Sequence, residues 1–169
     1  IDDKVVSEGK ALPSSQRVTH RYSKPYIAHA SIGLVCALAE PLRHSANQTG
    51  LTVYTHSQGV FKLRQQIAVA LGFSEDLLDV VHSPGAGCYG HNGADDVALD
   101  AAFLAHHLQV PVRVQWTRQD EMSVSPFGSA SLIELSAGLN DQGHITDWHA
   151  EVWSHRHLNR PGWSTGINL

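Results

Sequence analysis

The sequence is poor in cysteine and in basic residues, and each scarcity excludes a class of protein. Its 169 residues contain two cysteines, Cys36 and Cys88, which form no CxxC pair. Two such thiols supply neither an iron–sulfur cluster nor a structural zinc site, and they lack the density of a disulfide scaffold. Lysine and arginine total 12 against 16 acidic residues, for a formal net charge of −4, and they form no basic run. A nucleic-acid partner is therefore not expected.

Long apolar segments are also missing. No stretch approaches the roughly 20 apolar residues of a transmembrane helix, and the start IDDKVVSEGK lacks the basic and apolar parts of a secretion signal. Hydrophobic residues still make up 42% of the chain, enough for one globular core. We expect a single domain over residues 1–169. Because the chain does not begin with Met and ends in the unpatterned HRHLNRPGWSTGINL, we expect a fragment of a larger protein.

Hydrophobic periodicity predicts two main helices. From Val60 to Leu71 apolar residues recur at helical spacing, and Gly72 provides a natural end for that helix. A second apolar stripe begins near Asp95, where acidic residues suit the positive end of a helix dipole. The residues expected on the buried face of the second helix are Val97, Ala101, Leu104, Ala105 and Leu108.

Short β-branched and alternating segments predict the strands around these helices. The last two, residues 129–139 and 144–154, flank the turn formers of NDQG and predict a C-terminal antiparallel hairpin. The alternation from Ile145 to Trp153 is interpreted as core. Strands with and without intervening helices favour a mixed sheet, and thus an α+β fold, over a doubly wound parallel one. The other expected strands are residues 24–40, bent at Gly33, and residues 49–56, 77–83 and 110–116.

The segment before the second helix is rich in glycine. Gly85, Gly87 and Gly90 spell GxGxxG, the pattern of a dinucleotide-binding loop. A Rossmann loop places its third glycine inside the first helical turn, whereas Gly93 here still precedes the expected helix. Small residues also free backbone N–H groups to face an anionic or sulfur-bearing ligand. The segment is interpreted as a cofactor cradle, with a plain glycine-rich connector as the alternative.

Around this loop the sequence resembles the molybdopterin-binding catalytic subunits of the xanthine oxidase and aldehyde oxidase family. There a glycine-rich loop follows a TQ turn, a helix and a strand, and here the order is YTHSQG, a helix from Val60, DVVHS and GAGCYGHN. PYIAHASIG, VPVRVQWTRQDEM and LNDQGHITDWHAEVWS resemble further family segments, so the resemblance covers nearly the whole chain. The variant GAGCYGHNGADD is similar to the branch of nicotinate dehydrogenase and isoquinoline oxidoreductase large subunits.

The resemblance assigns cofactor contacts to four residues. Gln58 falls at the family glutamine whose side-chain amide hydrogen-bonds an oxo ligand of molybdenum, a task that suits a neutral, directional donor. Gly87, Cys88 and Tyr89 fall on the loop whose backbone N–H groups hold the metal centre and the pterin. Cys88 stands where the family has phenylalanine, and Tyr89 where it has glycine. Because backbone donors do not depend on the side chain, this departure bears on the substrate pocket more than on the cradle.

Two further positions bear on the substrate. Asn92 is expected in the substrate pocket, where xanthine-oxidising members carry a glutamate that handles the purine. Val124, in the segment SVSPFG, stands where those members carry a substrate arginine. Both differences make xanthine an unexpected substrate.

The resemblance implies one domain of a larger catalytic subunit that hydroxylates an N-heteroaromatic compound or oxidises an aldehyde with oxygen derived from water. The implied cofactor is molybdenum on molybdopterin, in the cytosine dinucleotide form, with [2Fe-2S] clusters only on a partner subunit. The implied partners are a small-molecule substrate, that iron–sulfur subunit and the rest of the catalytic subunit. The family's general-base glutamate lies beyond Leu169, so no residue here is assigned as catalytic and the chain alone is expected to be inactive.

The twelve histidines show no spacing typical of a metal site and are interpreted as surface or core residues, so no metal ligand is assigned. Two alternative functions stay open at this point. One is a Rossmann-like nucleotide-binding domain, and the other is a non-catalytic accessory or interaction domain.

Overall fold

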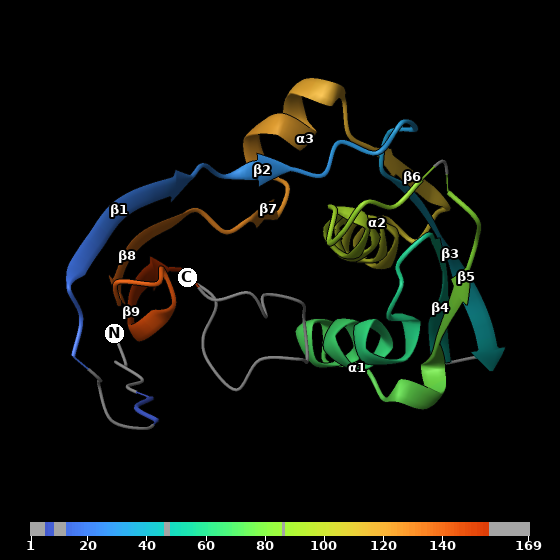
Figure 1. Cartoon of the computed structure of the whole chain (residues 1–169). Coiled ribbons are helices and arrows are strands. Elements are labelled where there is room, and N and C mark those ends of the chain that lie inside the picture. The colour runs from blue at the N-terminus through green and yellow to red at the C-terminus, as the bar shows by residue number, and fades with distance from the viewer. Residues whose placement is uncertain (1–5, 9–12, 46–47, 86, 156–169) are drawn as a thin grey trace. The chain divides into compact units, whose positions relative to one another are not determined.

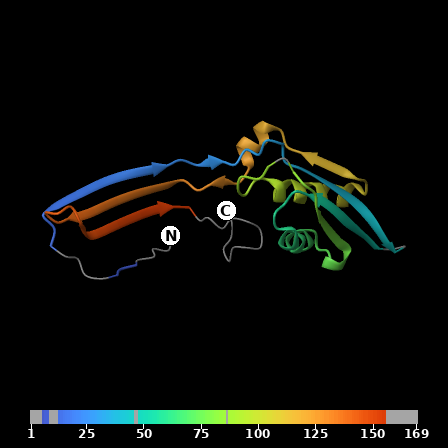
Figure 2. The same cartoon turned by 45° about the vertical axis from the view of Figure 1, so that its right-hand side comes forward.

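The described chain forms two compact units (Figures 1 and 2). The structure is a computed structural model that describes residues 6–8, 13–45, 48–85 and 87–155. The α/β unit is Tyr26–Gly128, and the sheet unit combines the described residues up to Pro25 with Ser129–His155. That residues 1–169 make a single domain stays a prediction. In the described part of the chain, no helix has the length and apolarity needed to cross a membrane.

A four-stranded mixed sheet forms the centre of the α/β unit. Its strand order is β5-β4-β3-β6, in which β4 and β5 run parallel and the other neighbours antiparallel. Helix α1 makes the crossover that a parallel pair requires, and α2 follows β5. The elements are β2 (Ile27–Ala28), β3 (Cys36–Ser45), β4 (Gln48–Thr55), α1 (Val60–Leu71), the 3₁₀ helix η1 (Glu75–Leu77), β5 (Leu78–His82), α2 (Ala94–Leu108), β6 (Val112–Gln115), α3 (Arg118–Val124) and β7 (Phe127–Gly128), with β2 and β7 forming a separate antiparallel pair.

The core of this unit lies between one face of the sheet and helices α1 and α2, which Figure 1 shows on the same side of it. Alternate strand residues face the helices, so that Ala39 of β3 stands beside Val53 of β4 and Val112 of β6. Small residues on α2 let that helix approach the sheet closely. The buried core residues are Val35, Ala37, Ala39, Leu51, Val53, Leu63, Ile67, Ala68, Leu78, Val97, Ala98, Ala101, Ala102 and Ala105.

The first turn of α2 carries two aspartates in different surroundings. Asp95 is 3% exposed and accepts a hydrogen bond from the Ser57 hydroxyl. Asp96 is half-buried, and its Oδ2 atom is buried without a hydrogen-bond partner among the described residues. Burial raises the pKa of Asp96 above its ordinary value; nearby Asp95 adds to the rise, while His91 and a backbone hydrogen bond oppose it. The two aspartates at the start of α2 therefore have different environments.

The sheet unit is a three-stranded antiparallel sheet with the order β1-β8-β9. The register places Val18 beside Ala137 and Ala137 beside Trp148, so apolar residues of all three strands share one face. The opposite face carries ion pairs such as Arg17 with Asp147 and Arg21 with Glu134. The strands are β1 (Gln16–Lys24), β8 (Ser131–Leu139) and β9 (Ile145–Ser154).

The interpretation of Ile145 to Trp153 as core is wrong. Ile145, Trp148, Val152 and Trp153 are 60%, 57%, 59% and 49% exposed. Alternation along a strand identifies which residues share a face, but it does not reveal whether anything packs against that face.

The predicted mixed α+β fold with two main helices and a C-terminal hairpin is confirmed. The segment 24–40 is divided into β2 and the start of β3. Neither β1, whose nine residues are all exposed, nor α3, which has seven residues, follows from the periodicity. The expected buried stripe of α2 is wrong at Leu104 and Leu108, which are 40% and 61% exposed. Alanines face the sheet instead, because close packing favours small side chains there.

Enlarging a buried alanine of α2 should destabilise the α/β unit. Ala101 is fully buried, so Ala101→Leu should lower the free energy of unfolding by about 1–3 kcal/mol through overpacking. Ala70→Leu, the same change at an exposed position of α1, should stay within about 0.5 kcal/mol of the parent chain. Urea denaturation followed by circular dichroism measures both values, and equal losses would contradict the packing described for α2.

The raised pKa of Asp96 predicts a pH-dependent gain for Asp96→Asn. Because the folded-state pKa lies above the unfolded one, ionised Asp96 lowers stability progressively as the pH rises from 3.8 through the raised pKa. The stability of Asp96→Asn relative to the parent chain should therefore increase between about pH 4 and pH 7. Urea titrations across this range measure the difference, with Asp141→Asn, at an exposed turn, as control. A difference that falls with rising pH would contradict the prediction.

Candidate functional site

The two segments that carry the expected cofactor contacts start at adjacent strand ends. β4 and β5 are parallel, and Thr55 at the end of β4 is registered with His82 at the end of β5. The turn with Gln58 follows β4, and the glycine loop, residues 83–93, follows β5. In open α/β sheets, the crevice beyond the carboxyl ends of parallel strands is where ligands bind. The parallel pairing therefore brings the Gln58 turn and the start of the glycine loop to one edge of the sheet.

Direct contacts hold the two segments side by side. The Ser83 backbone N–H donates to the Thr55 carbonyl over 2.8 Å. The His82 Nδ1 atom lies 3.1 Å from the Ser57 carbonyl oxygen. A Cβ atom added to Gly85 would lie 2.8 Å from His56 Cγ, so the imidazole ring packs directly against the glycine backbone. The start of the loop accordingly lies against the residues just before Gln58.

Ser57 anchors the turn from inside. It is 1% exposed, its hydroxyl donates to the Asp95 carboxyl group, and the same oxygen accepts from the Gly59 N–H over 3.1 Å. The Ser57 N–H donates to Thr55 Oγ1 over 3.2 Å, and Thr55 Oγ1 in turn donates to the Ala94 carbonyl. Gln58 itself is exposed. The structure thus buries the flanking polar groups and leaves the expected cofactor contact at the surface.

The middle of the glycine loop requires residues without a Cβ atom. Gly87 and Gly90 have φ values of +96° and +128°, where other residues are strained. A Cβ on Gly87 would lie 2.7 Å from the Tyr89 hydroxyl, and one on Gly90 would lie 2.2 Å from His29 Cδ2. The His29 Nδ1 atom lies 3.3 Å from the Pro126 carbonyl oxygen. The loop backbone is therefore packed on aromatic rings, and its glycines are required for that approach.

The loop amides differ in what they contact. The Gly87 N–H donates to the Gly85 carbonyl over 3.1 Å, so this amide already has an acceptor within the loop. The Cys88 thiol donates to the Gly90 carbonyl over 3.2 Å, and both Cys88 and Tyr89 are exposed. Among the described residues, the backbone amides of Cys88 and Tyr89 have no acceptor. Those two amides stand at positions that the family resemblance assigns to the cofactor.

Asn92 at the end of the loop is 6% exposed and bonded on both sides. Its Nδ2 atom donates to Ser31 Oγ over 2.9 Å, and its Oδ1 atom accepts from the Ala94 N–H over 3.1 Å. These contacts fasten the loop to the segment before β3 and to the start of α2. Its expected place in a substrate pocket stays a prediction.

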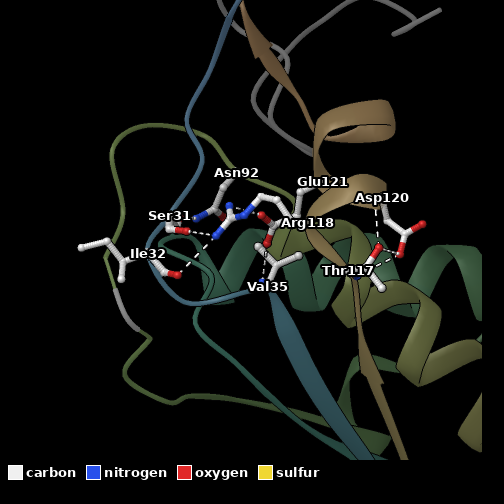
Figure 3. A network of polar contacts seen from close by, with 8 residues as sticks. All are labelled: Ser31, Ile32, Val35, Asn92, Thr117, Arg118, Asp120 and Glu121. Atoms are coloured by element: carbon white, nitrogen blue, oxygen red, sulfur yellow. Dashed lines mark hydrogen bonds and ion pairs between the residues drawn. The ribbon is translucent and has the colours of Figure 1, made fainter.

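A charged pair on α3 holds the segment that Asn92 contacts (Figure 3). Arg118 pairs with Glu121, which is 4% exposed, and donates to the Ser31 carbonyl over 2.6 Å. Glu121 also accepts from the Val35 N–H over 2.6 Å. A capping box between Thr117 and Asp120 fixes the start of α3. The short helix thereby fixes the chain that lies beside the end of the loop.

His56 lies beside the start of the glycine loop and is half-buried. Burial lowers the pKa of His56, and the nearby His82 lowers it further, whereas Asp95 and Glu121 act in the opposite sense. His56 is therefore neutral at pH 7, and its buried Nε2 atom has no hydrogen-bond partner among the described residues. The His91 Nε2 atom lies 3.2 Å from Asp95 Oδ2.

The arrangement suits an organic cofactor held by hydrogen bonds better than an ion held by side chains. No group of three or more histidine, cysteine, aspartate or glutamate side chains in the described ranges could hold a metal ion. The site instead offers the backbone amides of Cys88 and Tyr89 and the exposed side-chain amide of Gln58. These donors fit the oxygen-, nitrogen- and sulfur-bearing edge of a molybdopterin, whose metal is carried by the pterin.

Sequence reasoning did not single out His29, His56 and Ser57 as parts of this site. A signal for Ser57 is present, because it stands two residues after Thr55 and so continues the helix-facing side of β4. The contacts of His29 and His56 depend on residues distant in sequence and follow from the folded chain alone.

Comparison with known proteins identifies the family of this chain. The model of the molybdopterin cofactor-binding domain family matches residues 6–159. One of the subunits of nicotinate dehydrogenase from Pseudomonas putida is 41% identical over 138 residues, which cover 82% of this chain and 11% of the relative. The chain thus spans about a tenth of that curated relative.

Solved structures share the fold at low identity. Quinoline 2-oxidoreductase from Pseudomonas putida matches with a TM-score of 0.71 and 17% identity, over 82% of this chain and 17% of that one. Aldehyde oxidoreductase from Desulfovibrio gigas matches with a TM-score of 0.67 and 17% identity, over 82% and 15%. These matches do not favour a Rossmann-like nucleotide-binding domain. Together with the family match over most of its length, they establish that the chain belongs to the molybdopterin cofactor-binding domain family.

Proposed function

We propose that this chain forms part of the molybdenum site in the catalytic subunit of a molybdenum hydroxylase. The whole enzyme hydroxylates an N-heteroaromatic compound or oxidises an aldehyde, using oxygen derived from water. The observation that carries the proposal is the pairing of the Gln58 turn with the glycine loop at the carboxyl ends of β4 and β5, fixed by the Ser83 to Thr55 hydrogen bond. This arrangement places a side-chain amide and loop amides on neighbouring segments.

Each of the named residues has a defined task in this proposal. The backbone amides of Cys88 and Tyr89 donate to the pterin end of the cofactor, while Gly87 supplies the backbone conformation that presents them. The Gln58 side-chain amide would hold the metal end of the cofactor through a donated hydrogen bond. A neutral donor of this kind stabilises negative charge on oxygen without a proton of its own to lose. When bound, the cofactor supplies the two-electron oxidation of the substrate carbon.

The residues that are turned inward keep other groups away from these donors. Ser57 and Asp95 bond to each other, and Asn92 bonds to Ser31 and Ala94, so these polar groups are held by the protein. Because His56 is neutral, its imidazole adds no positive charge beside the loop. The proposed cofactor donors thus lie beside polar side chains whose hydrogen bonds are made within the protein.

The substrate and the partners follow from the relatives in outline. The names nicotinate dehydrogenase and quinoline 2-oxidoreductase favour an N-heteroaromatic substrate, and we keep Asn92 as the residue proposed for the substrate pocket. We include the cytosine dinucleotide form of molybdopterin and an electron-accepting [2Fe-2S] protein in the proposal. A non-catalytic accessory domain is the second candidate, and the molybdenum content of the purified protein separates the two.

Distorting the loop should remove the cofactor. Gly90→Ala combines a strained φ of +128° with a clash against His29, so the molybdenum content of the full-length protein, purified with its partner, should fall about tenfold or more. Gly143→Ala is the matched control, because its φ is +79° but an added Cβ would have no neighbour within 4 Å. Elemental analysis measures molybdenum per catalytic chain. Absence of molybdenum from the parent protein would refute the proposal and favour an accessory domain.

Removing the Gln58 amide should affect turnover more than cofactor content. Gln58→Ala should keep the molybdenum content within about twofold and lower kcat about tenfold to a thousandfold, the range found on removing one donor to a charged oxygen. Gln66→Ala, an exposed glutamine on α1, serves as the control and should leave kcat unchanged. Steady-state kinetics with nicotinate, quinoline and an aldehyde also identify the substrate class. An unchanged kcat in Gln58→Ala would contradict the role given to this residue.

A further inference from the structure

The turn that carries Gln58 is held in an unusual way. Gly59 is the N-cap residue of α1, and as a glycine it has no side chain with which to cap the helix. The Gly59 N–H instead donates to Ser57 Oγ over 3.1 Å, two residues back along the chain. Gln58 lies between the two residues that this bond joins. Its backbone position therefore depends on where the Ser57 hydroxyl oxygen stands.

The Ser57 hydroxyl is itself oriented by Asp95. A hydroxyl group has one proton, and Ser57 donates it to Asp95 Oδ1, which leaves the lone pairs of the oxygen for the Gly59 N–H. Hydrogen bonds in such a series polarise one another, so the bond from Ser57 to Asp95 strengthens the bond from the Gly59 N–H to Ser57. The direction of the series runs from Gly59 through Ser57 to Asp95.

Asp95 is a firm anchor for this series. It lies in the first turn of α2, it is 3% exposed, and His91 Nε2 stands 3.2 Å from its other carboxyl oxygen. Because α2 begins directly after the glycine loop, Asp95 moves with the far end of that loop. The start of the loop is already fixed to the same turn through the Ser83 N–H and the Thr55 carbonyl. Both ends of the loop are thus tied to the residues around Gln58.

We propose that Asp95 is a positioning residue for Gln58, acting through Ser57 to hold the Gln58 amide in register with the glycine loop. The inference rests on the proposed function, since it gives Gln58 the cofactor contact argued above. In this role Asp95 touches neither cofactor nor substrate. Asp95 fixes the position of the Gln58 turn, and so sets the direction in which the Gln58 side-chain amide donates.

Hydrogen exchange tests the positioning without bound cofactor. In the full-length protein prior to molybdenum insertion, Asp95→Ala should speed exchange of the Gly59 amide about tenfold, which matches the loss of one hydrogen bond. Ser57→Ala should have a similar effect, and the double variant should add little, because both changes break one series. Asp95→Asn keeps an acceptor for the Ser57 hydroxyl and should stay within about twofold of the parent. Asp96→Ala, the adjacent aspartate, is the matched control.

The loaded enzyme gives a second readout that a purely structural role would not move. Asp95→Ala should keep molybdenum within about twofold, shift the Mo(V) electron paramagnetic resonance spectrum in the direction seen for Gln58→Ala, and lower kcat about tenfold to a hundredfold with KM nearly unchanged. Asp95→Asn should restore the parent spectrum. Exchange of the buried β3 and β4 amides should not change in any variant, which separates loss of position from loss of folding.

The outcomes distinguish this inference from the proposed function. A parent protein without molybdenum refutes the proposed function, and the exchange experiment then still decides whether Asp95 fixes the turn. A parent protein that contains molybdenum and responds to Gln58→Ala, with an unchanged Gly59 amide and spectrum in Asp95→Ala, overturns the inference. Equal effects of Asp95→Ala and Asp96→Ala also overturn it, since Asp96 does not contact Ser57.

Discussion

The parallel pairing of β4 and β5 is the constraint on which the candidate site depends. A parallel pair requires a crossover, and α1 provides it, so that the segments after both strands emerge at the same edge of the sheet. An antiparallel pairing would send them to opposite edges. Gln58 and the glycine loop are separated by more than twenty residues in sequence, yet the register of Thr55 with His82 fixes their spacing.

The α/β core explains why that edge is rigid. The helix-facing side of the sheet carries alanines on β3, and α2 carries alanines against them, so helix and sheet meet closely. The same helix-facing alternation continues past the end of β4 to Thr55 and Ser57, which meet the first residues of α2 instead of its apolar middle. Polar groups thus replace methyl groups where the core ends. This change from apolar to polar contact turns a packing surface into a support for the loop.

Local patterns made the outline of the fold predictable from the sequence, and the family resemblance supplied the candidate cofactor contacts. Helix α1 lies at its expected bounds, and Gln58 could be assigned through the family resemblance because it lies in a short segment with recognisable order. The failures share a physical cause, since they depend on contacts between distant residues. Leu104 is more hydrophobic than the alanines of α2, yet the close approach to β3 selects the small residues. His29 and Asp95 likewise carry no sequence signal of the loop and turn that they support.

The glycine loop also differs from the family pattern at two residues. Cys88 and Tyr89 differ from the family pattern, and both are exposed residues whose backbone amides, not side chains, are assigned to the cofactor. Gly87 and Gly90 cannot vary in the same way, because their positive φ values and the aromatic rings beside them leave no room for a Cβ atom. The backbone at Gly87 and Gly90 is therefore tightly constrained, whereas the side chains of Cys88 and Tyr89 remain exposed beside it.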